Sequence, residues 1–393
     1  MQNFNFYTPT RVVFGKDVET QIGELVKARG AHKILIHYGG KSAERSGLLD
    51  RIRQSLKEAG IGYAELGGVV PNPHLDKVRE GIDLCKKEGV DFILAVGGGS
   101  AIDSAKAICY GMGEPDKDVW ELFEGKRKAK AFFPLAAVLT IAAAGSEMSN
   151  SCVITDEKTL LKRVYNDDIA RPLFAVMNPE LTKTLPDYQT ESGCADIMMH
   201  TMERYFSNGG SMDLTDGIAE ALIKTTMKSA EILHTDPENY NARAEVMWAS
   251  SLSHNGLTGC GTDGGDWVCH RMEHELGGMF NVTHGAGLAA IWGTWARYVY
   301  KNCLQRFVKY AVNVMEVEPA ATDEETAIKG IEAMEAFYRR ISMPTNLREL
   351  GVEPTEEEIV QMAESVVSAY GEPFGSAKKL TRNDFAEIYR RAM

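Results

Sequence analysis

The sequence lacks three features that mark specialised classes of protein: a long apolar run, Cys-x-x-Cys pairs, and a Pro/Gly/Ser-rich linker. A membrane-spanning helix needs roughly 20 consecutive apolar residues, so we expect no membrane span. Met1–Phe14 alternates polar and apolar residues and does not have the charged-then-apolar layout of a signal peptide. The net charge of -12 argues against nucleic acid or an anionic membrane as a partner.

The seven cysteines are scattered along the chain, and their number is odd. A secreted disulfide framework uses an even number of cysteines, and a zinc ribbon uses Cys-x-x-Cys pairs. We therefore expect free thiols and a cytoplasmic protein.

The first half of the 393-residue chain alternates short apolar runs with helical segments such as His74–Glu88. This alternation is typical of a doubly wound α/β domain with a parallel sheet. The expected buried strands are Lys33–Tyr38, Gly62–Leu66, Asp91–Val96 and Leu135–Thr140.

The second half shows helical periods and almost no strand signal. Helix starts are predicted at Thr184–Asp187, at Asp236-Pro237 and at Thr355 with Glu358. A chain of this length exceeds one compact core, so we predict an α/β domain over residues 1–183 and an all-helical domain over residues 184–393.

A glycine cluster, Gly97-Gly98-Gly99-Ser100, follows the predicted strand Asp91–Val96 and leads into a helix that carries Asp103 and Lys106. Glycines let the backbone approach a pyrophosphate, and the helix start offers unpaired N–H groups to it. The match to G-x-G-x-x-G is imperfect, because Ile102 stands where the third glycine would fall. Its position at the end of a strand still favours dinucleotide binding over a simple tight turn.

The end of the first predicted strand indicates which dinucleotide binds. An acidic residue there usually binds the ribose of NAD, but here Gly39-Gly40-Lys41-Ser42 follows Tyr38, with Arg45 one turn on. Lys41, Ser42 and Arg45 could hold a 2′-phosphate, whereas Glu44 is the only nearby carboxylate. We therefore predict NADP(H), the alternative being a solvated loop with an incidental lysine.

Histidines concentrate in the second half. Asp196 and His200 are four residues apart in a helical segment, His270 and His274 repeat this spacing, and His284 follows. Residues at this spacing lie on one face of a helix, so these side chains predict a divalent-metal site. The spacing leaves open which of the histidines are ligands. His32, His37, His74 and His234 are interpreted as surface or strand-end residues, and His254 stays undecided.

A rival interpretation uses His270-Arg271-Met272-Glu273-His274, which fits the H-x-x-E-H motif of inverted zinc peptidases. Glu273 would then be the general base. The motif is short, and this alternative leaves Asp196, His200 and the α/β half unexplained.

Taken together, these motifs resemble the iron-containing alcohol dehydrogenase family, close to its NADPH-dependent butanol dehydrogenase branch. The resemblance runs through the glycine cluster, Leu139-Thr140, Gly145-Ser146-Glu147, Asp196–Thr201, His270–Leu276 and His284-Gly285. The stretch before Gly145 departs from the family pattern, because Ala144 replaces a hydroxyl residue.

The resemblance implies an α/β dinucleotide-binding domain and an all-helical metal-binding domain, the dehydroquinate synthase-like architecture. It implies Asp196, His200, His270 and His284 as ligands of Fe²⁺, or of Zn²⁺, which the donor types alone allow equally. His274 would be a catalytic non-ligand beside the substrate. Thr140, Ser146 and Lys162 fall where the family contacts the nucleotide.

The function expected from this site is hydride exchange between NADP(H) and a small alcohol or aldehyde, with the metal as Lewis acid. His274, water or a ribose hydroxyl would carry the proton. A homodimer is expected from the resemblance and from the frequency of such assemblies. The competing classes are a dehydroquinate synthase-like cyclase that uses NAD transiently and a non-catalytic nucleotide sensor.

Overall fold

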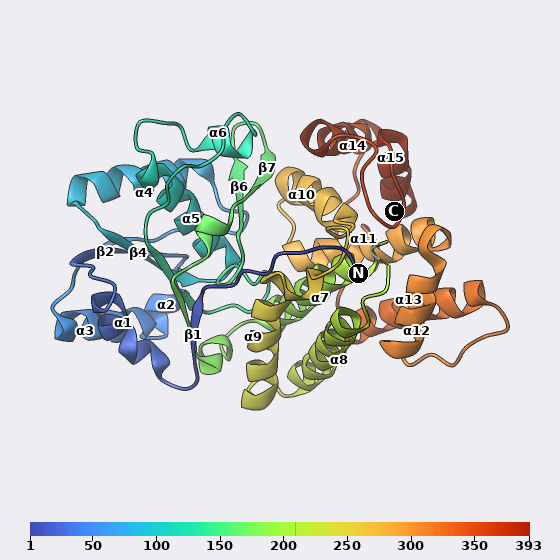
Figure 1. Ribbon diagram of the computed structural model, residues 1–393, viewed down its shortest axis with the longest axis horizontal. Helices are drawn as coiled ribbons and strands as arrows, with labels where there is room; N and C mark the ends of the chain where they lie inside the picture. The colour runs from blue at the N-terminus through green and yellow to red at the C-terminus, as the bar shows by residue number, and fades with distance from the viewer. Residues whose placement is uncertain (209) are drawn as a thin grey trace. The chain divides into compact units, whose positions relative to one another are not determined.

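The computed structural model describes residues 1–208 and 210–393. The chain divides into two compact units: Tyr7–Thr184 forms one, and Leu185–Met393 together with Met1–Phe6 forms the other. The first six residues are held there by contacts such as the Gln2 N–H, which donates to the Gly261 carbonyl at 3.0 Å. Figure 1 shows the elements of both units.

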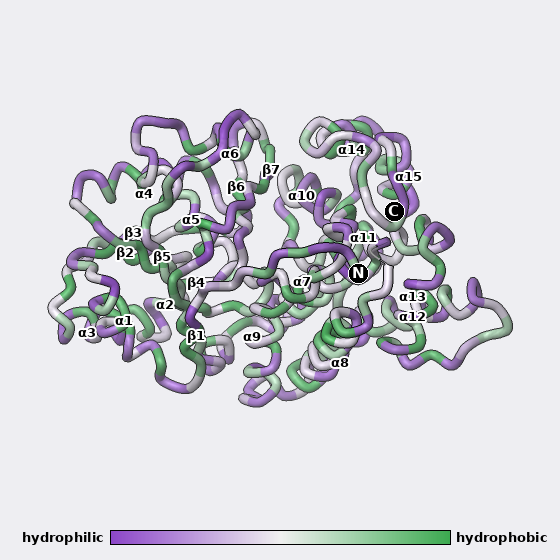
Figure 2. Tube along the Cα trace, viewed as in Figure 1, coloured by the Kyte–Doolittle hydropathy of each residue, from purple (hydrophilic) through white to green (hydrophobic). Residues whose placement is uncertain are grey.

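The first unit is built on one parallel sheet with the strand order β1-β8-β5-β4-β2-β3. Its strands are β1 (Arg11–Phe14), β2 (Lys33–Tyr38), β3 (Gly62–Leu66), β4 (Phe92–Gly97), β5 (Leu135–Leu139) and β8 (Phe174–Met177). All four strands predicted from the sequence are present, each to within one residue at either end. The inner strands β4 and β5 are among the hydrophobic stretches of the unit, as Figure 2 shows, because helices cover both faces of the sheet there.

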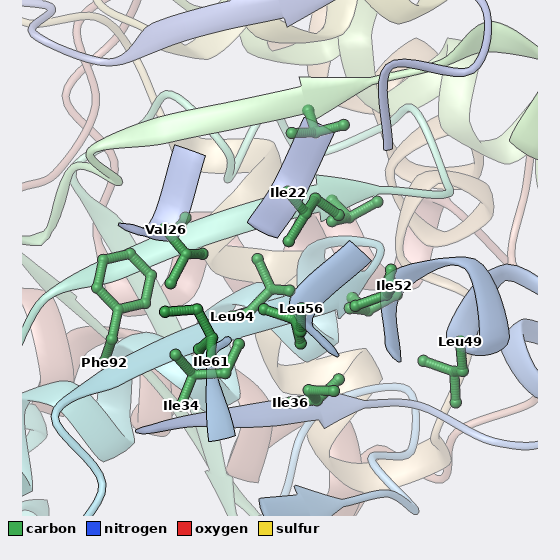
Figure 3. Packing of buried hydrophobic residues seen from close by; sticks show 14 of the residues in the cluster. Ile22, Val26, Ile34, Ile36, Leu49, Ile52, Leu56, Ile61, Phe92 and Leu94 are labelled. Carbon is green, nitrogen blue, oxygen red and sulfur yellow. The ribbon is translucent and has the colours of Figure 1, made fainter. Parts of the chain in front are cut away.

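The residues that alternate along the strands divide between the two faces. On one face Ile34, Ile36 and Leu94 pack against α1 (Ile22–Lys27) and α3 (Leu48–Ala59) in a buried cluster, which Figure 3 shows. On the other face lie α4 (Leu75–Glu88) and α5 (Gly99–Gly113). Two short helices, α2 (Ser42–Arg45) and α6 (Trp120–Phe123), complete the unit.

The sequence did not indicate three parts of this unit: β1, β8, and an antiparallel hairpin of β6 (Ser151–Asp156) and β7 (Leu161–Asn166). The buried positions of β6 include Ser151, Cys152 and Thr155 and do not alternate with exposed ones. Neither a continuous apolar run nor a period of two was therefore available in the sequence.

The second unit is helical, as predicted. Its helices are α7 (Asp187–Tyr205), α8 (Asp213–Thr235), α9 (Tyr240–His254), α10 (Val268–Phe280), α11 (His284–Val299), α12 (Leu304–Asn313), α13 (Asp323–Arg340), α14 (Glu356–Tyr370) and α15 (Arg382–Arg391). Outside the single undescribed residue, its only strand pairing is an isolated bridge between Phe374 and Leu380. No helix in the described part of the chain is long and apolar enough to cross a membrane.

Two of the three predicted helix starts are confirmed and one is wrong. Helix α7 begins at Asp187, inside the predicted segment but with Pro186 as N-cap and no capping side chain, and Thr355 and Glu358 form a reciprocal capping box on α14. Asp236-Pro237 starts no helix, because Asp236 is the C-cap of α8, and the Asn239 side chain caps α9 by accepting from the Ala242 N–H. An Asn that can accept from the third N–H is the stronger N-cap signal.

Candidate functional site

The predicted nucleotide residues gather where the strand order of the sheet reverses. The chain runs from β2 outward to β3, then returns to place β4 on the other side of β2. Tyr38 is paired with Val96, so Gly39 and Gly97 leave adjacent strands at the same level. Thr140 joins this edge, since its N–H donates to the Gly97 carbonyl at 3.0 Å. Ligands of open α/β sheets bind at such a switch point, outside the carboxyl ends of the strands.

Gly98 is required by close packing at the start of α5. A Cβ on Gly98 would lie 2.8 Å from the Ile141 Cβ, and one on Gly99 would lie 3.1 Å from the Ala144 Cβ. Gly98 is the N-cap of this 15-residue helix, and no side chain caps the helix. The first-turn N–H groups of Gly99 and Ser100 are thus placed as a helix start that can receive an anion.

Asp103, Ser146 and Lys106 form a hydrogen-bonded network in which Ser146 and Lys106 are buried and Asp103 is half-buried. The Ser146 hydroxyl donates to Asp103, whose other carboxylate oxygen accepts from the Val153 N–H at 2.9 Å. The Lys106 ammonium donates to Ser146 Oγ at 3.0 Å and to the Ser151 carbonyl at 2.7 Å. Burial lowers the pKa of Lys106. These residues tie α5 to the start of the hairpin, whose second strand carries the buried Lys162.

The segment after β2 is cationic in its free groups. Glu44 receives two hydrogen bonds of 3.0 Å each from the Arg53 guanidinium, which also donates to Asp50 and Glu65. Lys41 and Arg45 are exposed and have no ion-pair partner in the described part of the chain. Ser42 begins the short helix α2 beside them.

The metal residues of the sequence prediction meet in the helical unit. Asp196 lies on α7, His270 on α10, and His284 is the first residue of α11. The Nε2 atoms of His270 and His284 lie 3.6 Å and 3.7 Å from Asp196 Oδ1. Single ligand atoms of the three residues all fall within 4.8 Å of one another. Ligand atoms at about 2.1 Å from a tetrahedral ion lie roughly 3.4 Å apart, so the spacing suits one ion.

The electrostatics of this cluster also fit a cation. Asp196 Oδ1 and His270 Nε2 are buried and have no hydrogen-bond partner among the described residues. Burial opposes ionisation of Asp196, but the histidines around it lower its pKa well below its usual value. Burial likewise disfavours a charged His270, yet Glu203 and Asp196 outweigh it and raise the pKa of His270 to about 9. The carboxylates of Asp196 and Glu203 thus favour a cation at this position, which a divalent ion would supply.

His200 borders the cluster without supplying one of its three atoms. Its Nδ1 lies 3.0 Å from the Asp196 carbonyl, and its ring centroid is 4.3 Å from that of His270. Burial lowers the pKa of His200 to about 4, so the imidazole is neutral, which is the form that binds metals. Its Nδ1 also lies 3.1 Å from Asp196 Oδ1, so His200 contacts a candidate ligand on its own helix.

His274 lies beside the three-residue cluster and outside it. Its ring centroid is 6.0 Å from that of His284, and its Nδ1 is 3.4 Å from the Tyr370 hydroxyl. Tyr370 also packs against the Arg271 guanidinium, 4.2 Å from the ring centroid. This arrangement differs from the H-x-x-E-H peptidase alternative, in which His270 and His274 would both bind the ion.

Glu273 gives a second argument against the peptidase alternative. Its side chain is fully buried and accepts a hydrogen bond from His284 Nδ1. A general base must reach the attacking water, whereas this carboxylate is engaged with a candidate ligand.

Glu203 was not singled out from the sequence, and His37, expected at the surface or at a strand end, lies next to the end of β2. Glu203 is fully buried and hydrogen-bonded to His270 Nδ1, and its position seven residues after Asp196 on a helix was a usable signal. His37 is fully buried rather than at the surface, with Nε2 2.8 Å from Ser104 Oγ and Nδ1 3.0 Å from the Leu66 carbonyl. The undecided His254 lies against His200, with ring centroids 4.0 Å apart.

Comparisons with known proteins cover nearly the whole chain. A family model described as iron-containing alcohol dehydrogenase matches residues 9–179, and one described as Fe-containing alcohol dehydrogenase family, C-terminal, matches residues 190–393. NADH-dependent butanol dehydrogenase A of Clostridium acetobutylicum is 39% identical, with 100% of both chains covered. NADPH-dependent aldehyde reductase YqhD of Escherichia coli is 33% identical, with 90% of both chains covered.

Solved structures agree with these matches. The crystal structure of NADH-dependent butanol dehydrogenase A from Thermotoga maritima has a TM-score of 0.95 and 38% identity, covering 100% of this chain and 99% of that one. These similarities confirm the predicted fold class, an α/β domain and a helical domain in the dehydroquinate synthase-like architecture.

Proposed function

Because this chain belongs to the iron-containing alcohol dehydrogenase family, we propose that it is a metal-dependent alcohol dehydrogenase and aldehyde reductase that uses NADP(H). Its substrates are small aliphatic alcohols and aldehydes such as butanol and butanal. The observation that carries the proposal is the cluster of the buried Asp196 and His270 with the half-buried His284. The names of the relatives, butanol dehydrogenase and aldehyde reductase, support the substrate class.

Asp196, His200, His270 and His284 hold Fe²⁺ in this proposal, with Zn²⁺ as the alternative that the same donors accept. The bound ion supplies Lewis-acid polarisation of the substrate oxygen during hydride exchange with the nicotinamide. His274 moves the proton to or from that oxygen, because a neutral imidazole can do so near pH 7. The Tyr370 hydroxyl, 3.4 Å from His274 Nδ1, orients the ring.

The nucleotide is held by the switch-point residues. Gly97, Gly98, Gly99 and Ser100 receive the pyrophosphate at the start of α5, while Gly39, Gly40, Lys41 and Ser42 surround the adenosine ribose. Thr140 lies at the same edge and contacts the nucleotide, as do Asp103, Ser146 and Lys162 through the hairpin network. The family match by itself implies only a nicotinamide cofactor, and these residues specify how that cofactor would be bound.

The preference for NADP(H) rests on charge. Lys41 and Arg45 have no ion-pair partner among the described residues, whereas Glu44 shares the Arg53 guanidinium with Asp50 and Glu65, so Lys41 and Arg45 are the cations left to meet a 2′-phosphate. Some relatives are called NADH-dependent and others NADPH-dependent, so the cofactor preference has to be measured on this chain. Lys41→Ala should lower kcat/KM for NADPH by about 10-fold and leave that for NADH nearly unchanged. Lys57→Ala, in the last turn of α3, is the matched control. Equal losses with both cofactors would contradict the preference.

The proposed activity is tested with anaerobically purified, metal-stripped protein. NADPH oxidation with butanal is followed by absorbance after adding back Fe²⁺ or Zn²⁺. Sustained turnover restored by one ion supports the proposal and identifies the ion. Tight NADPH binding without net oxidation of NADPH by any short aldehyde would favour the cyclase or the sensor instead.

We further propose a cytoplasmic location and a homodimeric assembly. All seven cysteines are free thiols, which suits the reducing cytoplasm. We expect a homodimer, which light scattering coupled to gel filtration would measure directly.

A further inference from the structure

Two histidines of the candidate metal cluster are each held from behind by a different buried glutamate. His270 on α10 donates its Nδ1–H to Glu203 on α7, and His284 at the start of α11 donates its Nδ1–H to Glu273 on α10. Both glutamate side chains are completely buried. The three helices are thereby linked in series by carboxylate–imidazole contacts.

These contacts decide which ring nitrogen faces Asp196. A neutral imidazole whose Nδ1 donates to a carboxylate carries its proton there, which leaves the Nε2 lone pair free. The Nε2 atoms are the ones that lie 3.6 Å and 3.7 Å from Asp196 Oδ1. Both glutamates therefore select the tautomer and the ring orientation that coordination requires.

Glu203 is itself fixed more firmly than by this one contact. Its Oε1 accepts from the His270 backbone N–H at 3.2 Å, while its Oε2 accepts from the His270 ring. Glu203 and Asp196 are seven residues apart on α7, two helical turns, so one helix face carries a candidate ligand and an orienting group. A glutamine here would have to turn its NH₂ toward one of two N–H donors.

We infer that Glu203 and Glu273 are positioning residues for the metal: they orient His270 and His284 and, as buried anions, strengthen the site for a divalent ion. This inference rests on the proposed function, because it takes the cluster to bind a metal. Together with Asp196 the glutamates bring three buried carboxylates to the site, and burying anions without a cation is costly. Removing either glutamate charge should therefore weaken metal binding while the ligands themselves remain.

The experiment measures metal binding by full-length apoprotein, without substrate or cofactor. Zn²⁺ affinity is determined by competition with a chromophoric chelator for wild-type protein, Glu203→Gln and Glu273→Gln. Each variant should bind Zn²⁺ about 10 to 100-fold more weakly. The visible spectrum of the Co²⁺-substituted proteins should change as well, since an imidazole with the wrong tautomer or angle alters the ligand field.

Glu191→Gln is the matched control. Glu191 is also a buried glutamate on α7, and it accepts from the Nδ1 of a histidine, His234, that does not belong to the cluster. Its replacement should leave Zn²⁺ affinity and the Co²⁺ spectrum unchanged. If Glu203→Gln does not fold, Glu273→Gln and the shorter Glu273→Asp test the same inference at His284.

The outcomes separate the inference from the proposed function. If wild-type protein binds Zn²⁺ and both glutamine variants bind it within about threefold as tightly, Glu203 and Glu273 are not positioning residues. An equal loss in Glu191→Gln would likewise reduce the effect to general destabilisation. If wild-type apoprotein binds neither Zn²⁺ nor Fe²⁺, the proposed function itself is wrong.

Discussion

Replacing Gly285 by alanine should disrupt the candidate metal centre from outside it. Gly285 follows His284 at the start of α11, and a Cβ added there would lie 1.8 Å from the Ser192 carbonyl oxygen of α7. Because an ordinary contact needs about 3.4 Å, the two backbones must separate by roughly 1.5 Å. Both are parts of regular helices, so the start of α11 moves and His284 moves with it.

The expected loss of metal affinity follows from the narrow range of metal–ligand distances. Ligand distances vary by only about 0.2 Å, so the displacement removes His284 from its place near Asp196. We expect Gly285→Ala to lower Zn²⁺ affinity at least about 100-fold, the upper end of what losing an outer-shell partner costs. Overpacking should also cost about 1–3 kcal/mol of folding stability. Chelator competition and thermal unfolding of the apoprotein measure the two effects.

Gly293→Ala provides the control on the same helix. A Cβ there would meet Glu335 Oε1, the end of a side chain that can rotate away at the cost of its ion pair with Arg297. Alanine gains up to about 1 kcal/mol of helix propensity over glycine, so stability should change little and metal affinity not at all. If Gly285→Ala binds Zn²⁺ as tightly as Gly293→Ala does, the reasoning about α11 is refuted.

Three further predictions concern other residues. His274→Gln should lower kcat by about 10² to 10⁴-fold with unchanged metal content; loss of the metal would make His274 a ligand. Burial lowers the pKa of His37 from 6.5 to about 4, so the folded state is stabilised above pH 6.5 and loses that contribution as pH falls toward 4. When the pH is lowered from roughly 7.5 to 5, the protection of β2 against amide exchange should therefore fall by about 2 kcal/mol more in the wild-type protein than in His37→Gln. Equal losses in the two proteins would contradict this prediction. Lys106→Met should cost about 2–4 kcal/mol in denaturant unfolding, because the Ser149 and Ser151 carbonyls lose their buried donor; a change below about 1 kcal/mol would show that the network is dispensable.

The sequence predicted the parts of the fold whose signals are local. The strand Lys33–Tyr38 is centred on the apolar run Ile34–Ile36, and Thr355 with Glu358 is a reciprocal cap formed within one turn. The β6–β7 hairpin depends instead on non-local contacts, since Lys106 of α5 satisfies the Ser151 carbonyl. A polar strand of this kind is stable only because another element supplies its partners.

The candidate site was accessible from the sequence for a similar reason, and only in part. Asp196 with His200, and His270 with His274, show helical spacing that places each pair on one face. Which of His274 and His284 lies near Asp196 cannot be predicted from their spacing, because it depends on how α11 packs against α7. Glu203 and the burial of His37 were not predicted because burial with a specific partner, His270 or Ser104, is a tertiary property.

The placement of Met1–Phe6 makes the helical unit discontinuous, with the whole α/β unit inserted between its first segment and its remainder. The bond from the Gln2 N–H to the Gly261 carbonyl can form only after residue 261 has been synthesised. During synthesis the α/β unit is therefore complete in sequence while the first segment still lacks its partner. The cost of closing so long a loop rises only with the logarithm of its length, so the delay is mainly one of order: the sheet can fold first, and the N-terminal segment joins the helical unit afterwards.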